Sequence, residues 1–278
     1  VTFSKGFKCR VYAYFDDLYS PGFDYIPCFQ DFDLTGEKNL IFSLKPGGSI
    51  IVEGELRFVE ATRNPDYFEF TVVDPDTGSR PHEEGYVYDY GTEPFHNFLQ
   101  LPSRHVIVPA DTPVNILLNA SIFIVNKREY RTLLLGTLEP FILSMGQETK
   151  LRIEEPLSRF NLVTVQNCTN LAEKKLNEIE QRGFYITLER NDLAKAKDLV
   201  YKAQRELEAK SLDESHADLR EAYVATLQIE RRINDMYVDA SSSVTLLILF
   251  LSLTAVVLSS FLFEHGPVKI LATCLFSV

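Results

Sequence analysis

The sequence predicts an α+β protein anchored in a membrane, and three observations lead to this fold class. Residues 1–156 contain short apolar and aromatic runs separated by turn signals, which is typical of an antiparallel β-sandwich. Residues 157–243 repeat apolar positions at steps of three and four, which predicts a three-helix antiparallel bundle. Residues 244–263 form an uncharged apolar run long enough to cross a bilayer.

The first region is expected to contain about seven to nine short strands. Apolar and polar residues alternate in YFEFTVV and in parts of HVIVPADTPVNILLNASIFIV, as in strands with one buried face. The triplet Pro46-Gly47-Gly48 predicts a turn between two strands. Eight aromatic residues lie between Tyr12 and Phe32. We expect them to fill the sandwich core, and the alternative is an exposed platform for sugars or proline-rich peptides.

Three separate runs of the second region keep one heptad spacing, which strongly indicates packed helices. The repeating positions are Leu162, Val165, Thr169, Ala172, Leu176 and Ile179, then Leu193, Ala196, Val200, Ala203 and Leu207, then Leu219, Ala222, Thr226, Ile229, Ile233, Met236 and Ala240. Gly183 is expected to end the first helix. The expected start signals are Asn191 or Asp192 for the second helix, and Ser211 with Glu214, or Ser215 with Asp218, for the third.

The third region, VTLLILFLSLTAVVLSSFLF, has no charged residue, proline or glycine and predicts a transmembrane helix. The third helix of the bundle is expected to continue into it, because the serines at 241–243 weaken a helix without breaking it. Residues 264–267 predict a turn. Residues 268–278 predict the start of a second, truncated transmembrane helix, so we expect the natural chain to continue.

The orientation follows from weak charge and modification signals. Lys269 lies after the apolar run, so the positive-inside rule places the bulk of the chain outside the cytoplasm. Asn119 begins an Asn-Ala-Ser glycosylation pattern, which fits an outside location. Cys9 and Cys28 are candidates for a disulfide there, and the alternative is that both are small buried hydrophobic residues.

The turn between the first two helices is expected to lie beside the bilayer surface. In an up-down-up arrangement this turn and the end of the third helix share one end of the bundle. The turn contains Phe184, Tyr185 and Ile186, and aromatic side chains favour the lipid headgroup zone. These residues are therefore candidates for a membrane-interface anchor. The alternative is that all three fold back onto the end of the bundle.

Composition and motifs exclude several function classes. The formal charge of −11 argues against nucleic acid as a partner, because phosphate binding needs clustered Lys and Arg. No GxSxG, HExxH, phosphate-binding loop or GxGxxG pattern occurs, so no catalytic residue and no cofactor is predicted. The only metal candidates are weak ones in acidic loops, where carboxylates suit Ca²⁺. They are Asp74, Asp76, Glu83 and Glu84, and the alternative for them is a hairpin turn followed by a solvated acidic loop.

Two stretches carry a family resemblance. LKPGGSIIVEGELRF, residues 44–58, resembles the strand–turn–strand of carboxypeptidase-regulatory-like β-sandwich modules. The whole layout, with HVIVPADTPVNILLN and with FLFE followed by Lys269, is similar to archaeal envelope proteins that carry such a module, helices and a C-terminal membrane hairpin. The resemblance implies an accessory domain without a catalytic site. The aromatic opening at 12–32 is not part of the usual module.

These patterns together predict a non-catalytic envelope or cell-surface protein. It would sit in the cell membrane, contact the lipid bilayer and other membrane or envelope proteins, and present a binding or assembly domain on a helical stalk. One alternative is an accessory subunit of a membrane transport or secretion complex. A second alternative is a membrane-tethered, metal-dependent enzyme.

Overall fold

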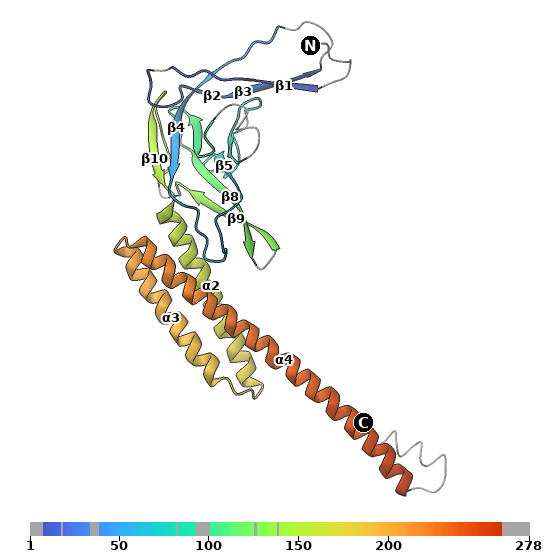
Figure 1. Cartoon of the computed structure of the whole chain (residues 1–278). Helices are drawn as coiled ribbons and strands as arrows, with labels where there is room; N and C mark the ends of the chain where they lie inside the picture. Colours follow the sequence, from blue (N-terminus) through green and yellow to red (C-terminus); the bar gives the residue numbers. More distant parts are fainter. Residues whose placement is uncertain are drawn as a thin grey trace. The chain divides into compact units, whose positions relative to one another are not determined.

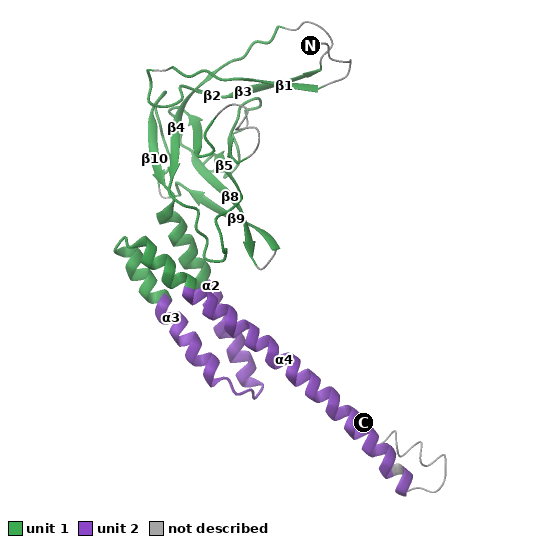
Figure 2. Cartoon of the chain, viewed as in Figure 1, with its two compact units in different colours: residues 1–165, 200–220 green, residues 166–199, 221–278 purple. Residues whose placement is uncertain are grey.

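The structure is a computed structural model that describes residues 8–17, 19–33, 39–81, 83–92, 101–124, 127–137 and 139–262 (Figure 1). The predicted turn at 264–267 and the second membrane segment at 268–278 lie outside these residues. The chain divides into two compact units (Figure 2). Unit 1 comprises Val1–Val165 and Val200–Arg220, and unit 2 comprises Gln166–Leu199 and Glu221–Val278. Each of the three described helices, whose bounds are given below, passes through both units.

Among its described residues, unit 1 contains ten strands in three sheets. The strands are β1 (Lys8–Ala13), β2 (Tyr25–Ile26), β3 (Cys28–Asp33), β4 (Lys45–Glu53), β5 (Tyr67–Val73), β6 (Asp89–Gly91), β7 (His105–Pro109), β8 (Asn115–Ile124), β9 (Lys127–Leu135) and β10 (Glu148–Arg152). One sheet pairs β1 with β3, a second has the order β10-β4-β2 with β7 also on β4, and a third has the order β6-β5-β8-β9. The predicted antiparallel pairing holds except at β10, which runs parallel to β4.

The turn predicted at Pro46-Gly47-Gly48 is wrong, because β4 runs straight through these residues. Packing explains the glycines. A side chain at Gly48 would meet Leu143 at 2.8 Å, and one at Gly47 would meet Ile26 and Ile107 at 3.2 Å. Neighbouring segments therefore approach the strand more closely than any larger residue permits. The two glycines that suggested a turn instead allow this close packing.

The core of unit 1 draws residues from the two four-stranded groups. Ile50 and Val52 of β4 and the buried run of β7 belong to the same cluster as Phe70 of β5 and Ile116 of β8. Burying one such side chain contributes about 1.5–3 kcal/mol. The alternation along YFEFTVV and NILLNASIFI places these residues on the buried side of their strands, as predicted.

Three helices follow the strands: α2 (Glu154–Gln181), α3 (Thr187–Glu208) and α4 (Leu212–Leu262). Gly183 ends α2 as predicted. It has a φ of 88°, and the amides of Gly183 and Phe184 donate to the carbonyls of Glu180 and Ile179. This is the Schellman pattern, in which glycine takes the left-handed position. Of the two predicted starts for α4, Ser211 is confirmed, because it directly precedes Leu212.

The predicted caps at Asn191 and Asp192 are wrong, because α3 begins at Thr187. The carbonyl of Ile186 accepts the first helical hydrogen bond, from the amide of Arg190 at 3.0 Å, and the Ile186 side chain is buried. Burial of this apolar side chain fixes where the helix starts, in the absence of a polar capping residue. A cap is worth only about 1 kcal/mol, less than the burial of an isoleucine.

Unit 2 is held together by the predicted heptad positions. Ala172, Leu176, Ile179, Leu193, Ile229 and Ile233 from the three helices form one buried cluster with Ile186. Ion pairs set the register. Glu173 pairs with Lys197 at 2.7 Å, Asp192 with Arg232 at 2.7 Å, and Lys175 with Glu230 at 2.6 Å. Exposed ion pairs contribute at most about 1 kcal/mol each, so the apolar cluster supplies most of the stability.

The C-terminal part of α4 exposes most of its apolar side chains. The part of the chain that the structure describes contains one helix long and apolar enough to cross a membrane, and only 6% of its most apolar window is buried. A core helix of a soluble protein would be mostly buried. Leu246, Phe250 and Leu253 are instead exposed, as are most of their neighbours. The helix is continuous through Ser241–Ser243, as predicted from the absence of a helix breaker.

Candidate functional site

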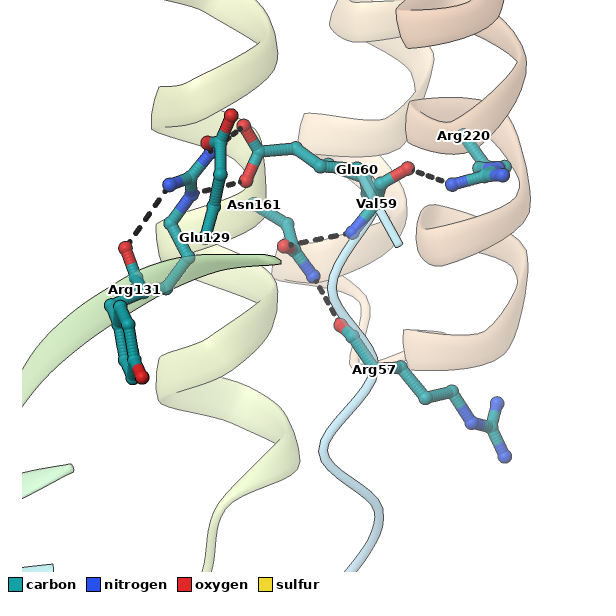
Figure 3. Close-up of polar contacts among 8 residues, drawn as sticks. Arg57, Val59, Glu60, Glu129, Arg131, Asn161 and Arg220 are labelled. Atoms are coloured by element: carbon teal, nitrogen blue, oxygen red, sulfur yellow. Dashed lines mark hydrogen bonds and ion pairs between the residues drawn. The ribbon is translucent and has the colours of Figure 1, made fainter. Parts of the chain in front are cut away.

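The loop that follows β4 lies against the helix ends of unit 1, and it forms the candidate site (Figure 3). We call the contacts of residues 57–61 with α2, α4 and β9 the joint. Asn161 of α2 is its centre and is only 2% exposed. Its Oδ1 accepts from the amide of Val59 at 3.2 Å, and its Nδ2 donates to the carbonyl of Arg57 at 2.8 Å. One side chain thus satisfies two backbone groups of a loop that has no strand partner.

Arg220 of α4 binds the same loop from the other side (Figure 3). Its guanidinium donates to the carbonyl of Val59 and, at 2.7 Å, to the carbonyl of Ala61. Val59 itself is fully buried. Side chains of helices α2 and α4 therefore both form hydrogen bonds with the backbone of this loop. A hydrogen bond from a charged group contributes about 1.5–3 kcal/mol, so this contact is stronger than a neutral one.

Arg131 of β9 completes the joint. Its guanidinium makes two hydrogen bonds with the Glu60 carboxylate, at 2.5 and 2.8 Å, and one with Glu129 at 2.8 Å. The paired side chains of Glu60 and Arg131 are 10% and 23% exposed. The hydrogen bond with Glu60 raises the pKa of Arg131 further above its usual value. A partly buried, bidentate ion pair of this kind fixes the relative orientation of the two side chains as well as the distance between them. It therefore holds β9 to the loop.

A small pocket of about 290 Å³ lies beside the joint in unit 1. Charged side chains of both signs line it, including Arg57 and Asp213, and His216 lies among them. Arg57 pairs with Asp213 at 2.7 Å. Burial lowers the pKa of His216, and the positive charges of Arg57 and Arg220 lower it further, whereas Asp213 opposes them. His216 is therefore held in the neutral form near pH 7.

In unit 2, the turn between α2 and α3 packs on the last polar part of α4. The rings of Phe184 and Tyr237 meet edge to face, with centroids 6.1 Å apart, and the guanidinium of Arg182 lies 5.6 Å from the centre of the Tyr237 ring. Ile186 is 3% exposed and Phe184 is partly buried, whereas Tyr185 is 88% exposed. Of the three predicted anchor residues, only Tyr185 is free to contact a membrane surface.

No family model, curated protein or solved structure was found that matches this chain.

The predicted disulfide is wrong. β1 and β3 pair antiparallel with Cys9 opposite Phe32 and Cys28 opposite Ala13. The two cysteines are four positions apart along the ribbon, about 13 Å at the rise of a strand, whereas a disulfide needs Cα atoms within about 7 Å. Both thiols are free. Burial raises the pKa of Cys28, so its thiol stays protonated.

The four weak metal candidates are not brought together. The Asp74 carboxylate accepts from the amides of Asp76 and Thr77 at 3.0 and 2.9 Å, which is a turn contact. Glu83 is paired with Lys45 at 2.7 Å. Among the described residues, no group of three or more His, Cys, Asp and Glu side chains could hold a metal ion. The predicted hairpin turn at 74–78 accounts for what the structure shows there.

Asn119, the predicted glycosylation site, lies on β8. Its side chain is half-buried, and its Oδ1 accepts from the Thr132 hydroxyl of β9 at 2.8 Å. Ser121 of the same pattern is buried. Modification of Asn119 stays a prediction.

Sequence reasoning missed the residues of the joint. Asn161 offered one signal, because it lies four positions before Val165 and so on the buried side of its helix. A polar residue at such a position usually satisfies another polar group. Glu60, Arg131 and Arg220 offered no signal, since their partners lie 71 and about 160 positions away. What the joint can do is mechanical: it fixes strands to helices.

Proposed function

We propose that this chain is a non-catalytic, membrane-anchored envelope protein that holds a β-sandwich binding or assembly module on a three-helix bundle. One observation carries the proposal. Helix α4 leaves the packed helices without a break and then exposes most of its apolar residues up to Phe261. So large an apolar surface is stable only in lipid or under a partner. The resemblance to envelope proteins with a carboxypeptidase-regulatory-like module supports the same proposal.

Membrane fractionation tests the anchor. The full chain should stay in the membrane pellet after washing with alkaline carbonate, because a spanning helix resists extraction. A chain that ends at residue 243 should be released, and a Leu249→Arg, Leu253→Arg double variant should be released in part, because each charge is costly at the bilayer centre. Complete extraction of the unaltered chain by carbonate would refute the anchor.

We further propose that the bulk of the chain lies outside the cytoplasm. Tyr19 is almost fully exposed in unit 1, so a Tyr19→Cys variant offers a reporter there. In a chain with the four native cysteines replaced, this residue should react with a membrane-impermeant maleimide on intact cells. A cysteine that reacts only after lysis would reverse the orientation.

Tyr185 is proposed to rest at the lipid headgroups. Tyr237, which the α2–α3 turn contacts, lies seven residues before Val244, or about 10 Å along the helix. A nitroxide label at position 185 should therefore show headgroup depth in proteoliposomes, whereas a label at the exposed Lys195 of α3 should remain in water. Equal, fully aqueous accessibility at both positions would rule out the anchor while leaving the spanning helix intact.

The second candidate is an accessory subunit of a membrane complex. It is favoured by the same exposed apolar helix, because helices of a partner would cover it as well as lipid does. Native mass spectrometry from mild detergent separates the two. A monomer with bound lipid supports the anchored module, and a stable complex with other chains supports the subunit.

A further inference from the structure

A pocket of about 600 Å³ opens in unit 1, away from the joint. Its walls come from β3, from the segment before β4, and from the segment that leads into β6. This volume falls in the range of small-molecule sites. The pocket therefore has the size of a ligand site, and its chemistry decides which ligand suits it.

Aromatic rings form much of the pocket wall, contributed by Phe29, Phe42, Tyr86 and Tyr88. The rings of Tyr86 and Tyr88 lie 6.4 Å apart. The Tyr86 hydroxyl donates to the carbonyl of Ser43 at 3.0 Å, which holds this ring in place. Fixed rings offer apolar contact area at low cost in conformational entropy.

The carboxylates around the pocket are mostly neutralised. Three of them have ion pairs: Asp31 with Arg10 at 2.6 Å, Glu83 with Lys45 at 2.7 Å, and Asp89 with Arg80 at 2.9 Å. Glu84 is exposed and takes part in none of these three pairs. The pairs leave a net charge near −1 and hold the carboxylate oxygens in fixed positions as hydrogen-bond acceptors. Such a rim does not favour a strongly charged ligand.

The hydroxyl group of Tyr88 is the second observation. Tyr88 lines the pocket, is only 4% exposed, and its hydroxyl has no hydrogen-bond partner in the described structure. Burial raises the pKa of this phenol, and the nearby charge of Glu83 raises it further, so the hydroxyl keeps its proton. A buried donor without a partner is costly, and it gains most from an acceptor that arrives with a ligand.

We propose that this pocket binds a neutral, hydroxyl-rich ligand, namely a saccharide. The aromatic rings would contact the apolar face of the sugar ring, the fixed carboxylates would accept from its hydroxyls, and Tyr88 would donate to one of its oxygens. This inference is independent of the membrane anchor. It returns to the aromatic segment at 12–32, where Phe29 lines the pocket. Tyr12 and Phe23 pack against the core, whereas Tyr14, Phe15 and Tyr19 are exposed, so the prediction that this segment fills the core is wrong for these three.

The test is an array of neutral oligosaccharides probed with the full chain in detergent, followed by calorimetry on the strongest hit. The unaltered protein should bind at least one neutral glycan. Tyr88→Phe and Glu84→Gln should each weaken binding about five- to tenfold, the effect of one lost hydrogen bond. Glu178→Gln, the same charge change on the exposed face of α2, should leave binding unchanged.

Three outcomes would overturn the proposal. The first is that the folded, unaltered chain binds no neutral glycan. The second is that it binds only sulfated, sialylated or amine-bearing compounds. The third is that Tyr88→Phe and Glu84→Gln bind as tightly as Glu178→Gln. Thermal unfolding of each variant shows that a loss of binding is not a loss of fold.

Discussion

Two buried tyrosines, two positions apart in the chain, differ in the partner of the hydroxyl group. Tyr90 is fully buried and donates to the carbonyl of Val87 at 2.8 Å, whereas the hydroxyl of Tyr88 has no partner in the described structure. A satisfied buried hydroxyl stabilises the fold, and an unsatisfied one costs about 1–3 kcal/mol. The same substitution should therefore have opposite effects at the two positions.

Tyr88→Phe should raise the free energy of unfolding by about 1 kcal/mol, because it removes a desolvated donor. Tyr90→Phe should lower it by about 1–2 kcal/mol, because it leaves the carbonyl of Val87 without this donor. Urea unfolding followed by circular dichroism measures both changes. A loss of stability in Tyr88→Phe as large as that in Tyr90→Phe would show that Tyr88 already has a partner.

Asn161→Ala should lower the free energy of unfolding by about 2–4 kcal/mol. The change leaves the buried amide of Val59 and the partly buried carbonyl of Arg57 without this hydrogen-bond partner, and each unsatisfied group costs about 1–3 kcal/mol. Asn167→Ala on the exposed face of α2 is the matched control and should change stability by less than about 0.5 kcal/mol. Equal effects of the two variants in urea unfolding would remove Asn161 from the joint.

Among the elements, α4 is one continuous helix through the serines at 241–243, where a hinge was conceivable. The hydroxyl of Thr245 donates to the carbonyl of Ser241 at 2.9 Å, so a polar side chain next to the serines bonds within the helix. Met236 still packs on the buried cluster, which supports the helix to within two turns of Val244. The apolar end of α4 is therefore continuous with a packed helix.

Spin labels at the exposed positions 228 and 250 test this continuity. They lie 22 residues apart, so a straight helix predicts a single narrow distance of about 33 Å between them. Ser242→Pro should broaden and shorten the distribution, because proline removes a helical hydrogen bond and clashes with the preceding turn. Ser242→Ala should leave it unchanged. A distribution that is already broad in the unaltered chain would indicate a hinge.

The elements also show where local sequence signals mislead. The heptad pattern identified the packed positions of α2, α3 and α4 from Val165 to Ile233, because helical packing repeats every three or four residues. The turn at Pro46-Gly47-Gly48 and the cap at Asn191 failed, because close packing on β4 and burial of Ile186 outweighed local preference. The parallel pairing of β10 with β4 joins segments about 100 residues apart, which no local pattern encodes.

For the molecule as a whole, two half-buried histidines predict a stability that depends on pH. Burial lowers the pKa of His216 and of His105, so both prefer the neutral form in the folded protein. In the unfolded chain both take up a proton near pH 6.5. The unfolded state then binds more protons, and stability present above about pH 6.5 is lost as the pH falls below it.

The thermal unfolding midpoint of the full chain in detergent should therefore decrease as the pH is lowered from about 7 to about 5. His216→Gln should reduce this decrease. The histidine lies near Arg57, Arg220 and Asp213, and the neutral glutamine amide that replaces it takes up no proton in the folded or the unfolded chain. We attribute the remaining decrease of the midpoint to His105, whose buried Nδ1 lacks a partner in the described structure. A midpoint that rises on acidification would contradict the predicted pH dependence of stability.

The sequence by itself determined the α+β class, the three helices, their buried positions and the apolar end of α4, because each of these features is a pattern of residues close together in the chain. Only the tertiary structure decided the joint, the separation of Cys9 from Cys28, and the burial of Phe184 and Ile186 beside an exposed Tyr185. These features depend on contacts between residues far apart in the chain. Such contacts are selected by shape and by hydrogen-bond partners, and neither is visible before the chain has folded.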